Sequence, residues 1–347
     1  MNRTSSSSSG RTRPVNNGPD LPRIIVWHIT GAAGDDRATP PSGKAAPGSE
    51  PLNMSESMLV IDSIARTAKP IVVLSGEEIL GRLPRLAEML EYGRALGLKM
   101  IVEVSPEELT DGVLKAFIHF GERIFRVRIG EALGRQPDTR GDNSPLFGKL
   151  EACLDRIERA GYETHLVYTA TEPDLRKLAL MHDYALRRSA RGLYYHLRFD
   201  LDDGTRRADG EEVDDFIKRF ATMKEYSPST MIISPQCVRF VHTSRRRPHQ
   251  GAGLVSNHPE WEYTCVAGKS YAYIDRTGAV RLCGGQPGAG ISLRETGYDF
   301  RKIWFLSAGF TGARASCTHC LHGYHSLSPA GEVDRFPDRD EAPAPPI

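Results

Sequence analysis

Apolar and polar positions form two alternating kinds of segment along the first two thirds of the chain. Short runs of β-branched and other apolar residues, typical of strands, are separated by longer segments whose apolar residues recur every three to four positions, as in amphipathic helices. Near-continuous apolar strands that alternate with such helices indicate a parallel sheet covered by helices. The predicted strands are 23–30, 70–76, 99–105, 123–130, 164–170 and 192–200.

The helical spacing is clearest in 83–97, 146–161 and 172–190. Cys153 lies on the apolar stripe of the second of these segments, so we expect it in the core. Right-handed crossovers curl such βα units into a partial or closed barrel. The predicted fold class is therefore α/β, with a six-unit (βα) partial barrel over residues 22–225.

The connection after the first strand is unusual. After Thr30 the chain runs through about two dozen residues rich in Gly, Pro, Ala and Ser, without periodicity. A loop of this length in a compact domain is usually functional or disordered. It follows the carboxyl end of a barrel strand, on the face where βα loops build active sites.

The pattern changes after residue 225. Residues 226–260 are irregular and are predicted to be a linker, while "KSYAYIDRTGAVRL" predicts a hairpin and 298–315 a helix. We expect a small cysteine-rich domain over 261–326. The Ser/Arg-rich start, 1–21, is predicted to be a disordered tail, with an organelle transit peptide as the alternative, and 327–347 is predicted to be a Pro-rich tail.

Charge and hydropathy exclude several classes of protein. The net charge of +1 gives no global field that would recruit nucleic acid or a membrane surface. No apolar run approaches the roughly 18 residues that span a bilayer, and the start lacks the apolar region of a secretory signal. We therefore expect a cytoplasmic, reducing environment, in which clustered cysteines bind metal more often than they form disulfides.

The cysteines are concentrated near the carboxyl end, where four of the six lie. Cys265 and Cys283 flank the predicted hairpin, and Cys317 and Cys320 form a Cys-x2-Cys turn that can grip one metal ion or cluster. Four thiolates suit either a tetrahedral zinc ion or a [4Fe–4S] cluster, and the remaining alternative is buried, unliganded cysteine. Cys237 is a nearby candidate for an extra ligand.

Several stretches resemble the radical S-adenosylmethionine (SAM) superfamily, over roughly residues 22–325. "CVAGKSYAYIDRTGAVRLCGG", followed by "FRKIW" and "CTHC", resembles its auxiliary-cluster (SPASM or twitch) domain. "LPRIIVWHIT" is similar to the family's first strand, "PIVVLSGEEIL" to the strand and loop of its Gly-Gly-Glu-Pro motif, and "PDTRGDNSPLFGKLEACLDRIERAG" to the segment after its fourth strand. The most similar branch modifies haem precursors and peptide-derived cofactors.

The family's defining motif is missing from this chain. The resemblance implies Cys-x3-Cys-x2-Cys in the loop after the first strand, where three thiolates hold a [4Fe–4S] cluster with one iron open to the amino and carboxyl groups of SAM. Aligned on Thr30, these positions fall at about Ala33, Arg37 and Pro40, none of which ligates a cluster in the usual way. We therefore predict that classical radical generation from SAM is absent.

The second family motif is altered as well. It reads Ser75, Gly76, Glu77, Glu78, Ile79, so Gly76 and Glu78 match the family, whereas Glu77 replaces a glycine and Ile79 a proline. The resemblance makes Ser75, Gly76 and Glu78 the candidates for a vestigial SAM pocket. The alternative is a solvated or salt-bridged loop end.

The resemblance also limits the number of auxiliary clusters. Family members with two such clusters carry further cysteines after the Cys-x2-Cys pair, but no thiol follows Cys320 here. The expected cofactor is therefore one [4Fe–4S] cluster. Its predicted ligands are Cys265, Cys283, Cys317 and Cys320, with His319, His322 or His325 as substitutes.

These observations predict a radical-SAM-like pseudoenzyme. It would act as a redox or substrate-presenting protein in cofactor or peptide maturation. Its partners would be a maturase enzyme, a peptide or cofactor precursor, or an electron carrier, with no nucleic acid and no membrane. The alternatives are an active maturase that uses SAM or another small molecule in non-standard chemistry, and a zinc-bound scaffold.

Overall fold

The computed structural model describes most of the barrel and part of the region that follows it. The predicted tails, the loop with Ala33, Arg37 and Pro40, and the carboxyl-terminal segment with Cys317, His319, Cys320, His322 and His325 lie outside the described residues. The structure describes residues 21–30, 50–120, 124–129, 145–170, 174–197, 210–234, 236–241, 260–265, 267–284, 290–307 and 310.

A ten-stranded sheet organises the described residues, with the order β12-β11-β10-β1-β2-β3-β4-β5-β6-β7. All pairings from β10 through β1 to β7 are parallel, as expected for consecutive βα units. The first seven strands are β1 (Ile24–Thr30), β2 (Ile71–Gly76), β3 (Lys99–Val104), β4 (Ile124–Arg128), β5 (Glu163–Ala170), β6 (Gly192–Leu197) and β7 (Thr230–Ser234).

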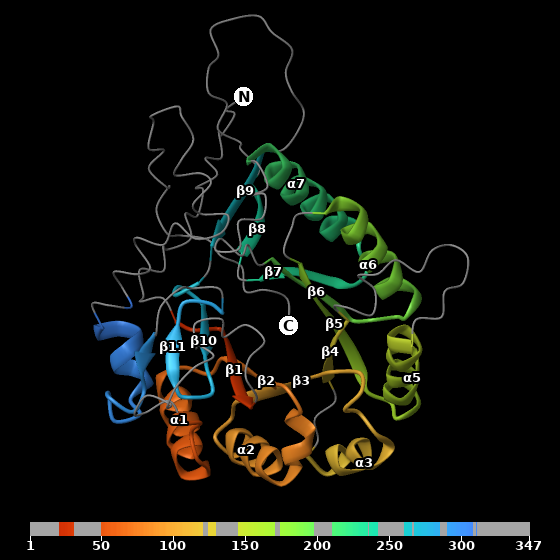
Figure 1. Cartoon of the computed structure of the whole chain (residues 1–347). Helices are drawn as coiled ribbons and strands as arrows, with labels where there is room; N and C mark the ends of the chain where they lie inside the picture. Colours follow the sequence, from red (N-terminus) through yellow and green to blue (C-terminus); the bar gives the residue numbers. More distant parts are fainter. Residues whose placement is uncertain are drawn as a thin grey trace, which may run out of the picture.

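Helices cover the outer side of the curved sheet (Figure 1). Their apolar stripes face the strands, and on α5 the buried positions are Leu150, Cys153, Leu154 and Ile157, which confirms the predicted stripe. The helices are α1 (Met54–Thr67), α2 (Leu83–Ala95), which follows a short 3-10 turn η1 (Ile79–Arg82), α3 (Asp111–Phe120), α5 (Pro145–Arg159), α6 (Leu175–Arg187) and α7 (Gly210–Tyr226).

The predicted α/β partial barrel is confirmed, and β1 to β6 are the six strands expected from the sequence. The barrel is not closed, because β7 and β12 are the two edges of the sheet as far as the structure describes it. The strand β7 lies in the segment expected to be a linker. Its short run "TMIIS" is flanked by Ser and Pro, which obscured it in the sequence.

The region after β7 supplies two further strand pairs. β8 (Gln236–Val241) and β9 (Glu260–Cys265) form a separate antiparallel pair. β10 (Tyr271–Ile274) and β11 (Ala279–Arg281) form the predicted hairpin, and β12 (Ile291–Ser292) pairs with β11. Because Tyr273 of β10 pairs in parallel with Val26 of β1, the hairpin extends the barrel sheet.

The hairpin turn is fixed by one carboxylate and one glycine. Oδ1 of Asp275 accepts hydrogen bonds from the Thr277 amide at 2.9 Å, the Thr277 hydroxyl at 2.7 Å and the Ala279 amide at 3.0 Å. Gly278 has φ +87°, a left-handed conformation that glycine adopts without steric cost. A Cβ on Gly278 would also lie 3.0 Å from the side chain of Leu52, so the turn packs closely against the segment before α1.

The predicted helix over 298–315 begins two residues later than expected, at Phe300, and 311–315 lie outside the described residues. Among the described residues, helical structure runs from Phe300 through η2 (Lys302–Leu306), Ser307 is extended, and Phe310 is again helical. Tyr298 has φ +62°, which prevents the helix from starting there, and the Phe300 amide donates to Ser63 Oγ of α1 at 2.8 Å. The first helical residue, Phe300, is thus held by a hydrogen bond to α1.

A cluster of charges joins α1 to the segment after β12, and we call it the Glu56 clamp (Glu56, Arg294 and Tyr298). Arg294 binds both carboxylate oxygens of Glu56, at 2.7 and 2.9 Å, and the Tyr298 hydroxyl donates to Oε1 at 2.6 Å. Glu56 also completes the capping box of α1 by accepting from the Asn53 amide at 2.7 Å. The clamp fixes the carboxyl-terminal region against the barrel.

None of the helices that the structure describes is both long and apolar enough to span a membrane.

Candidate functional site

Polar side chains occupy alternate positions on neighbouring strands of the barrel. His28 of β1 pairs with Ser75 of β2, and Glu103 of β3 pairs with Arg126 of β4. The neighbouring residue Phe125 packs edge-on against Phe117 of α3, so Arg126 points to the opposite, concave side of the sheet. We call the set His28, Ser75, Glu103, Arg126 and His196 the interior row.

The interior row is connected by polar contacts across five strands. The Ser75 hydroxyl donates to Glu103 Oε1 at 3.2 Å and lies 3.3 Å from His28 Nε2. Arg126 Nη2 lies 3.2 Å from Glu103 Oε2 and 3.3 Å from His196 Nε2 of β6. Because arginine has no acceptor, a hydrogen bond here requires His196 Nε2 to be the acceptor.

The ion pair at the centre of the row is buried. Glu103 is 6% exposed and Arg126 is 2% exposed. Burial alone would raise the pKa of the Glu103 carboxyl, but the guanidinium of Arg126, assisted by His196, Arg128 and His28, outweighs it and holds that pKa below its usual value. Glu103 is therefore an ionised carboxylate inside the barrel.

A second histidine lies beside the pair without carrying charge. His165 of β5 is the strand partner of Arg126, and its ring stacks on Tyr194 with centroids 5.5 Å apart. Burial lowers the pKa of His165 to about 4, with a further contribution from Arg126. His165 is thus neutral at pH 7, and Arg126 itself lies 4.2 Å above the Tyr194 ring.

The carboxyl ends of β1 and β2 are held together at the mouth of the barrel. Thr30 Oγ1 donates to the Glu77 carbonyl at 2.6 Å. Gly76 has φ +150°, and a Cβ there would meet the Thr30 side chain and lie 2.9 Å from its carbonyl oxygen, so only glycine fits. Arg128 donates to the Gly76 carbonyl at 2.9 Å and to Ser105 Oγ at 2.6 Å.

A hollow of about 350 Å³ opens at this mouth. Both Glu77 and Glu78 are exposed there, and Glu78 has φ +49°, an uncommon conformation for a residue with a side chain. We call it the mouth hollow, and its lining residues are Thr30, Glu77, Glu78, Gly81 and Arg82.

The residues predicted for a vestigial SAM pocket fall in two different environments. Ser75 is fully buried and its hydroxyl is engaged by the interior row, whereas Glu78 lies on the exposed rim of the mouth hollow. Gly76 lies between them and serves the close approach of β1 and β2. Their role in binding SAM stays a prediction.

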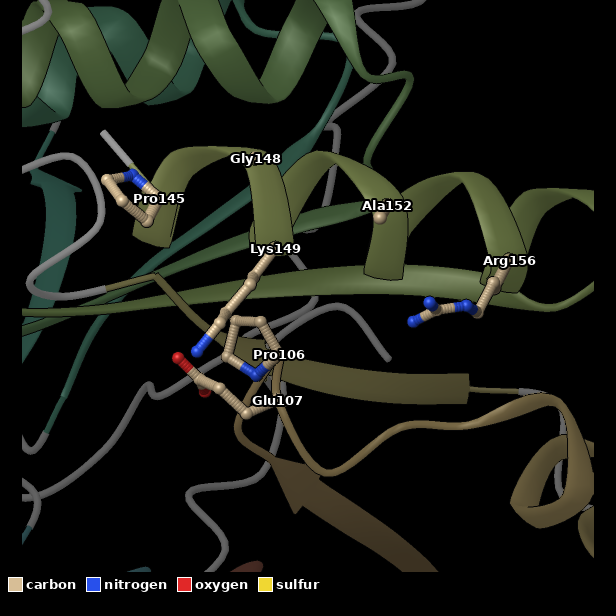
Figure 2. A pocket seen from close by; sticks show the side chains of 7 residues that line it. All are labelled: Pro106, Glu107, Pro145, Gly148, Lys149, Ala152 and Arg156. Atoms are coloured by element: carbon tan, nitrogen blue, oxygen red, sulfur yellow. The ribbon is translucent and has the colours of Figure 1, made fainter. Parts of the chain in front are cut away.

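A larger hollow of about 430 Å³ lies outside the barrel, between the loop after β3 and α5. Figure 2 shows Lys149 extending from α5 toward Pro106 and Glu107, with Arg156 at the other end. Arg156 is already engaged, since it donates to the Leu109 carbonyl at 3.0 Å and lies 3.7 Å from Asp111. This hollow is open surface, and its described lining holds no buried polar atom that lacks a partner.

The predicted cluster ligands are only partly described. Cys283 is a buried residue just after β11. Cys265 ends β9, and its backbone pairs with Gln236, next to Cys237. The described part of the chain groups no three Cys, His, Asp or Glu side chains in a way that would hold a metal ion, and the other predicted ligands lie outside that part. The four-cysteine site stays a prediction.

The residue after Cys283 packs against an aromatic side chain that contacts the interior row. The residue after it, Gly284, lies against the ring of Tyr273, where a Cβ would be 3.3 Å from the ring. The same ring lies 5.3 Å from that of His28. The turn that carries Cys283 is therefore separated from the barrel interior by a single aromatic side chain.

The donor set for the family's SAM-cleaving cluster does not fit this chain. No cysteine precedes Cys153 in the sequence. Cys153 is fully buried on α5, where burial raises the pKa of its thiol to about 12. A group with this pKa does not supply a thiolate, so we derive no step through such a cluster.

The interior row was missed at the sequence level. Its signal was present as polar residues at every second position near the carboxyl ends of the strands, for example in "WHIT", "EVS" and "FRVR". These strands were classed as near-continuous apolar runs, because the apolar residues on the helix-covered face dominate their composition.

The fold of the described residues is similar to that of solved proteins. The chain resembles SuiB of Streptococcus suis, solved with bound S-adenosylmethionine, with 11% identity and a TM-score of 0.53 over 87% of this chain and 70% of that one. A structure of SuiB with its precursor peptide SuiA matches equally well, at 11% identity and TM-score 0.53, with the same coverage of both chains.

A relative in sequence points in the same direction. The chain is 24% identical over 301 residues, 82% of each protein, to the AdoMet-dependent heme synthase of Methanosarcina barkeri (strain Fusaro / DSM 804). No family model matches the chain. The resemblance to the radical SAM superfamily, with its maturase branch, is confirmed.

Proposed function

We propose that this protein is a radical-SAM-fold partner in the maturation of a peptide or cofactor, and that it does not cleave SAM by the family's usual route. It presents the precursor to a partner maturase or passes electrons to it. One observation carries the proposal: the chain keeps the barrel, yet no cysteine precedes Cys153.

Four cysteines near the carboxyl end support a single retained cluster. Cys265, Cys283, Cys317 and Cys320 offer the thiolates that a [4Fe–4S] cluster requires, and such a cluster would supply one-electron transfer. The buried contact from Gly284 through Tyr273 to His28 would then bring this centre close to the barrel interior.

The chain's own residues supply the remaining functions. The interior row offers hydrogen-bond donors and acceptors at the centre of the barrel, and the mouth hollow offers the entrance. Ser75, Gly76 and Glu78 would shape what remains of a SAM pocket. The described barrel thus supports binding and orientation of a ligand.

Anaerobic purification tests the cluster count directly. We expect about four iron and four sulfide per chain, and no 5′-deoxyadenosine after reduction in the presence of SAM. Formation of 5′-deoxyadenosine would overturn the proposal in favour of an active maturase, and a preparation that holds only zinc would favour the scaffold. Calorimetry with SAM adds a second measurement, for which we expect millimolar or absent binding.

Matched cysteine variants test the predicted ligands. Cys283→Ser should lose most of the iron and the visible absorbance, whereas Cys153→Ala should keep the iron content per folded chain, because Cys153 lies in the core. Equal iron content in the two variants would exclude Cys283 as a ligand.

A further inference from the structure

We propose that the centre of the barrel binds an uncharged amide group of a ligand, such as a peptide bond of a precursor, between Glu103 and Arg126. We call Glu103, Arg126, His165 and Tyr194 the ion-pair site. The inference deepens the proposed function, on which it rests for the nature of the substrate, and its test does not depend on the cluster.

The ion pair of the site is poorly arranged for stability. Arg126 approaches Glu103 through Nη2 only, at 3.2 Å, instead of through the two parallel hydrogen bonds that the guanidinium can form. Both side chains are more than nine-tenths buried. A buried pair offsets its desolvation only with excellent geometry and further hydrogen bonds. This pair has further contacts, from the Ser75 hydroxyl to Glu103 Oε1 at 3.2 Å and from Arg126 to His196 Nε2 at 3.3 Å, but it lacks the two parallel hydrogen bonds.

Three buried atoms at this site make no hydrogen bond of good geometry, although Glu103 Oε2 lies 3.2 Å from Arg126 Nη2. They are Glu103 Oε2, Arg126 Nε and His165 Nδ1. Buried polar atoms in proteins are nearly always paired, so unpaired ones grouped in one place indicate a missing partner. Glu103 Oε2 is an acceptor and Arg126 Nε is a donor, and the missing partner must therefore present both a donor and an acceptor.

The charge balance of the interior selects an uncharged partner. Glu103 is matched by Arg126, and Glu108 lies 3.8 Å from Arg128. His165 is neutral at pH 7, because burial lowers its pKa to about 4. The charges of these two ion pairs therefore cancel, so an anion or a cation beside them would add a charge that neither pair matches.

An amide satisfies all of these conditions. Its N–H can donate to Glu103 Oε2 while its carbonyl accepts from Arg126 Nε, and the group carries no net charge. The stacked rings of His165 and Tyr194 form a flat wall beside the pair. Gly192 makes room for this wall, because a Cβ there would lie 3.2 Å from both rings.

The mouth hollow lies at the carboxyl ends of the strands that carry the first residues of the interior row. Thr30 and Glu77 line the hollow; His28 precedes Thr30 by two residues on β1, and Ser75 of β2 precedes Glu77 by two residues. Ser75 in turn donates to Glu103 at 3.2 Å, so the row connects the mouth to the ion-pair site.

Nuclear magnetic resonance of the arginine side chains provides the test on the whole protein. The probe is N-acetylglycine N-methylamide, a capped peptide unit, and sodium acetate is the comparison ligand at equal pH and ionic strength. We expect the amide to shift the Arg126 Nε–H signal, assigned with Arg126→Lys, in a saturable manner and with at least tenfold higher affinity than acetate. Equal or tighter binding of acetate would overturn the proposal.

Paired variants separate recognition from folding. The double variant Glu103→Gln, Arg126→Gln removes both charges together and is expected to stay folded while amide affinity falls at least tenfold. The double variant Asp62→Asn, Arg66→Gln removes an exposed pair on α1 and should bind as the wild type does. Unchanged amide affinity in the first variant contradicts the proposal. If that variant unfolds, Gly192→Ala provides the test, because its Cβ crowds both rings. It should lower the affinity for the amide probe, and an unchanged affinity would contradict the proposal.

These measurements distinguish the two proposals. A chain that binds the amide but forms 5′-deoxyadenosine refutes the proposed function and leaves the ion-pair site standing. A chain with one cluster and no binding of the amide refutes the ion-pair site alone.

Discussion

The interior row and the Glu56 clamp both contain a carboxylate beside an arginine, but their geometries differ. In the clamp, Arg294 binds both oxygens of Glu56, and Tyr298 and the Asn53 amide add further hydrogen bonds. In the interior row, Arg126 Nη2 lies 3.2 Å from Glu103 Oε2 without the parallel second contact seen in the clamp, and neither Glu103 Oε2 nor Arg126 Nε makes a hydrogen bond of good geometry.

The two sites also differ in exposure. The clamp has the better hydrogen-bond geometry but is the more exposed of the two. The side chains of Glu56 and Arg294 are 15% and 24% exposed, whereas those of Glu103 and Arg126 are 8% and 3% exposed. If an ion pair stabilises the fold, its hydrogen-bond geometry should be best where burial makes the desolvation cost largest. The inverse arrangement indicates that the clamp stabilises the fold and that the interior pair serves a ligand.

The largest expected effect is on the interior pair. Arg126→Met removes the main cation beside the buried Glu103, so the carboxyl is expected to take up a proton, and at pH 7 this costs about 3 kcal/mol for a group of ordinary pKa. Urea unfolding should show this loss, and the variant should become relatively more stable as the pH falls. Addition of Glu103→Gln should restore most of the stability, and a single variant within about 1 kcal/mol of the wild type would contradict the assignment.

A smaller loss is expected at the clamp. Glu56→Gln removes the charge from a set of hydrogen bonds, each worth about 1.5–3 kcal/mol when fully buried, and partial exposure reduces the expected total to about 1–2 kcal/mol. Thermal unfolding measures it, with Glu91→Gln on the exposed face of α2 as the control. A loss no larger than that of the control would show that the clamp does not stabilise the fold.

The pH dependence of the clamp follows from its lowered pKa. The hydrogen bond from Arg294, followed by those from Tyr298 and Asn53, lowers the pKa of Glu56 from 4.5 to about 2. A lowered pKa contributes stability that is complete above the unfolded value and is lost as pH falls through the folded value. The stability difference between wild type and Glu56→Gln should thus be constant above about pH 5 and shrink between 4.5 and 2. A constant difference across this window would contradict the lowered pKa.

The sequence was sufficient for the barrel but not for its centre. Strand order and helix faces follow from local periodicity, and for that reason β1 to β6 and the stripe of α5 were predicted. The contact between Glu103 and Arg126 depends on how strands align across the sheet, which no local pattern specifies. The polar residues of each strand were visible, but their meeting point was not.

The predicted motif residues show the same limit. Ser75 and Glu78 are three positions apart in sequence, yet one faces the interior row and the other the exposed rim. The turn with Gly76 at φ +150° and Glu78 at φ +49° separates them, and it exists because β1 and β2 approach closely at Thr30. Such a turn is a consequence of tertiary packing and cannot be predicted from the local sequence. The sequence analysis therefore placed Ser75 and Glu78 in the same pocket.

The smallest effect expected at the clamp concerns one hydroxyl. Tyr298→Phe removes the hydrogen bond to Glu56 Oε1 but leaves both contacts from Arg294, so we expect a loss of about 0.5–1 kcal/mol. Tyr226→Phe is the matched control, since Tyr226 is 79% exposed. In Glu56→Gln the same Tyr298→Phe change should cost less, because the hydroxyl then faces an uncharged acceptor. Equal costs in the two backgrounds would show that the hydroxyl stabilises the fold independently of the Glu56 carboxylate, and the clamp would then be a set of separate contacts.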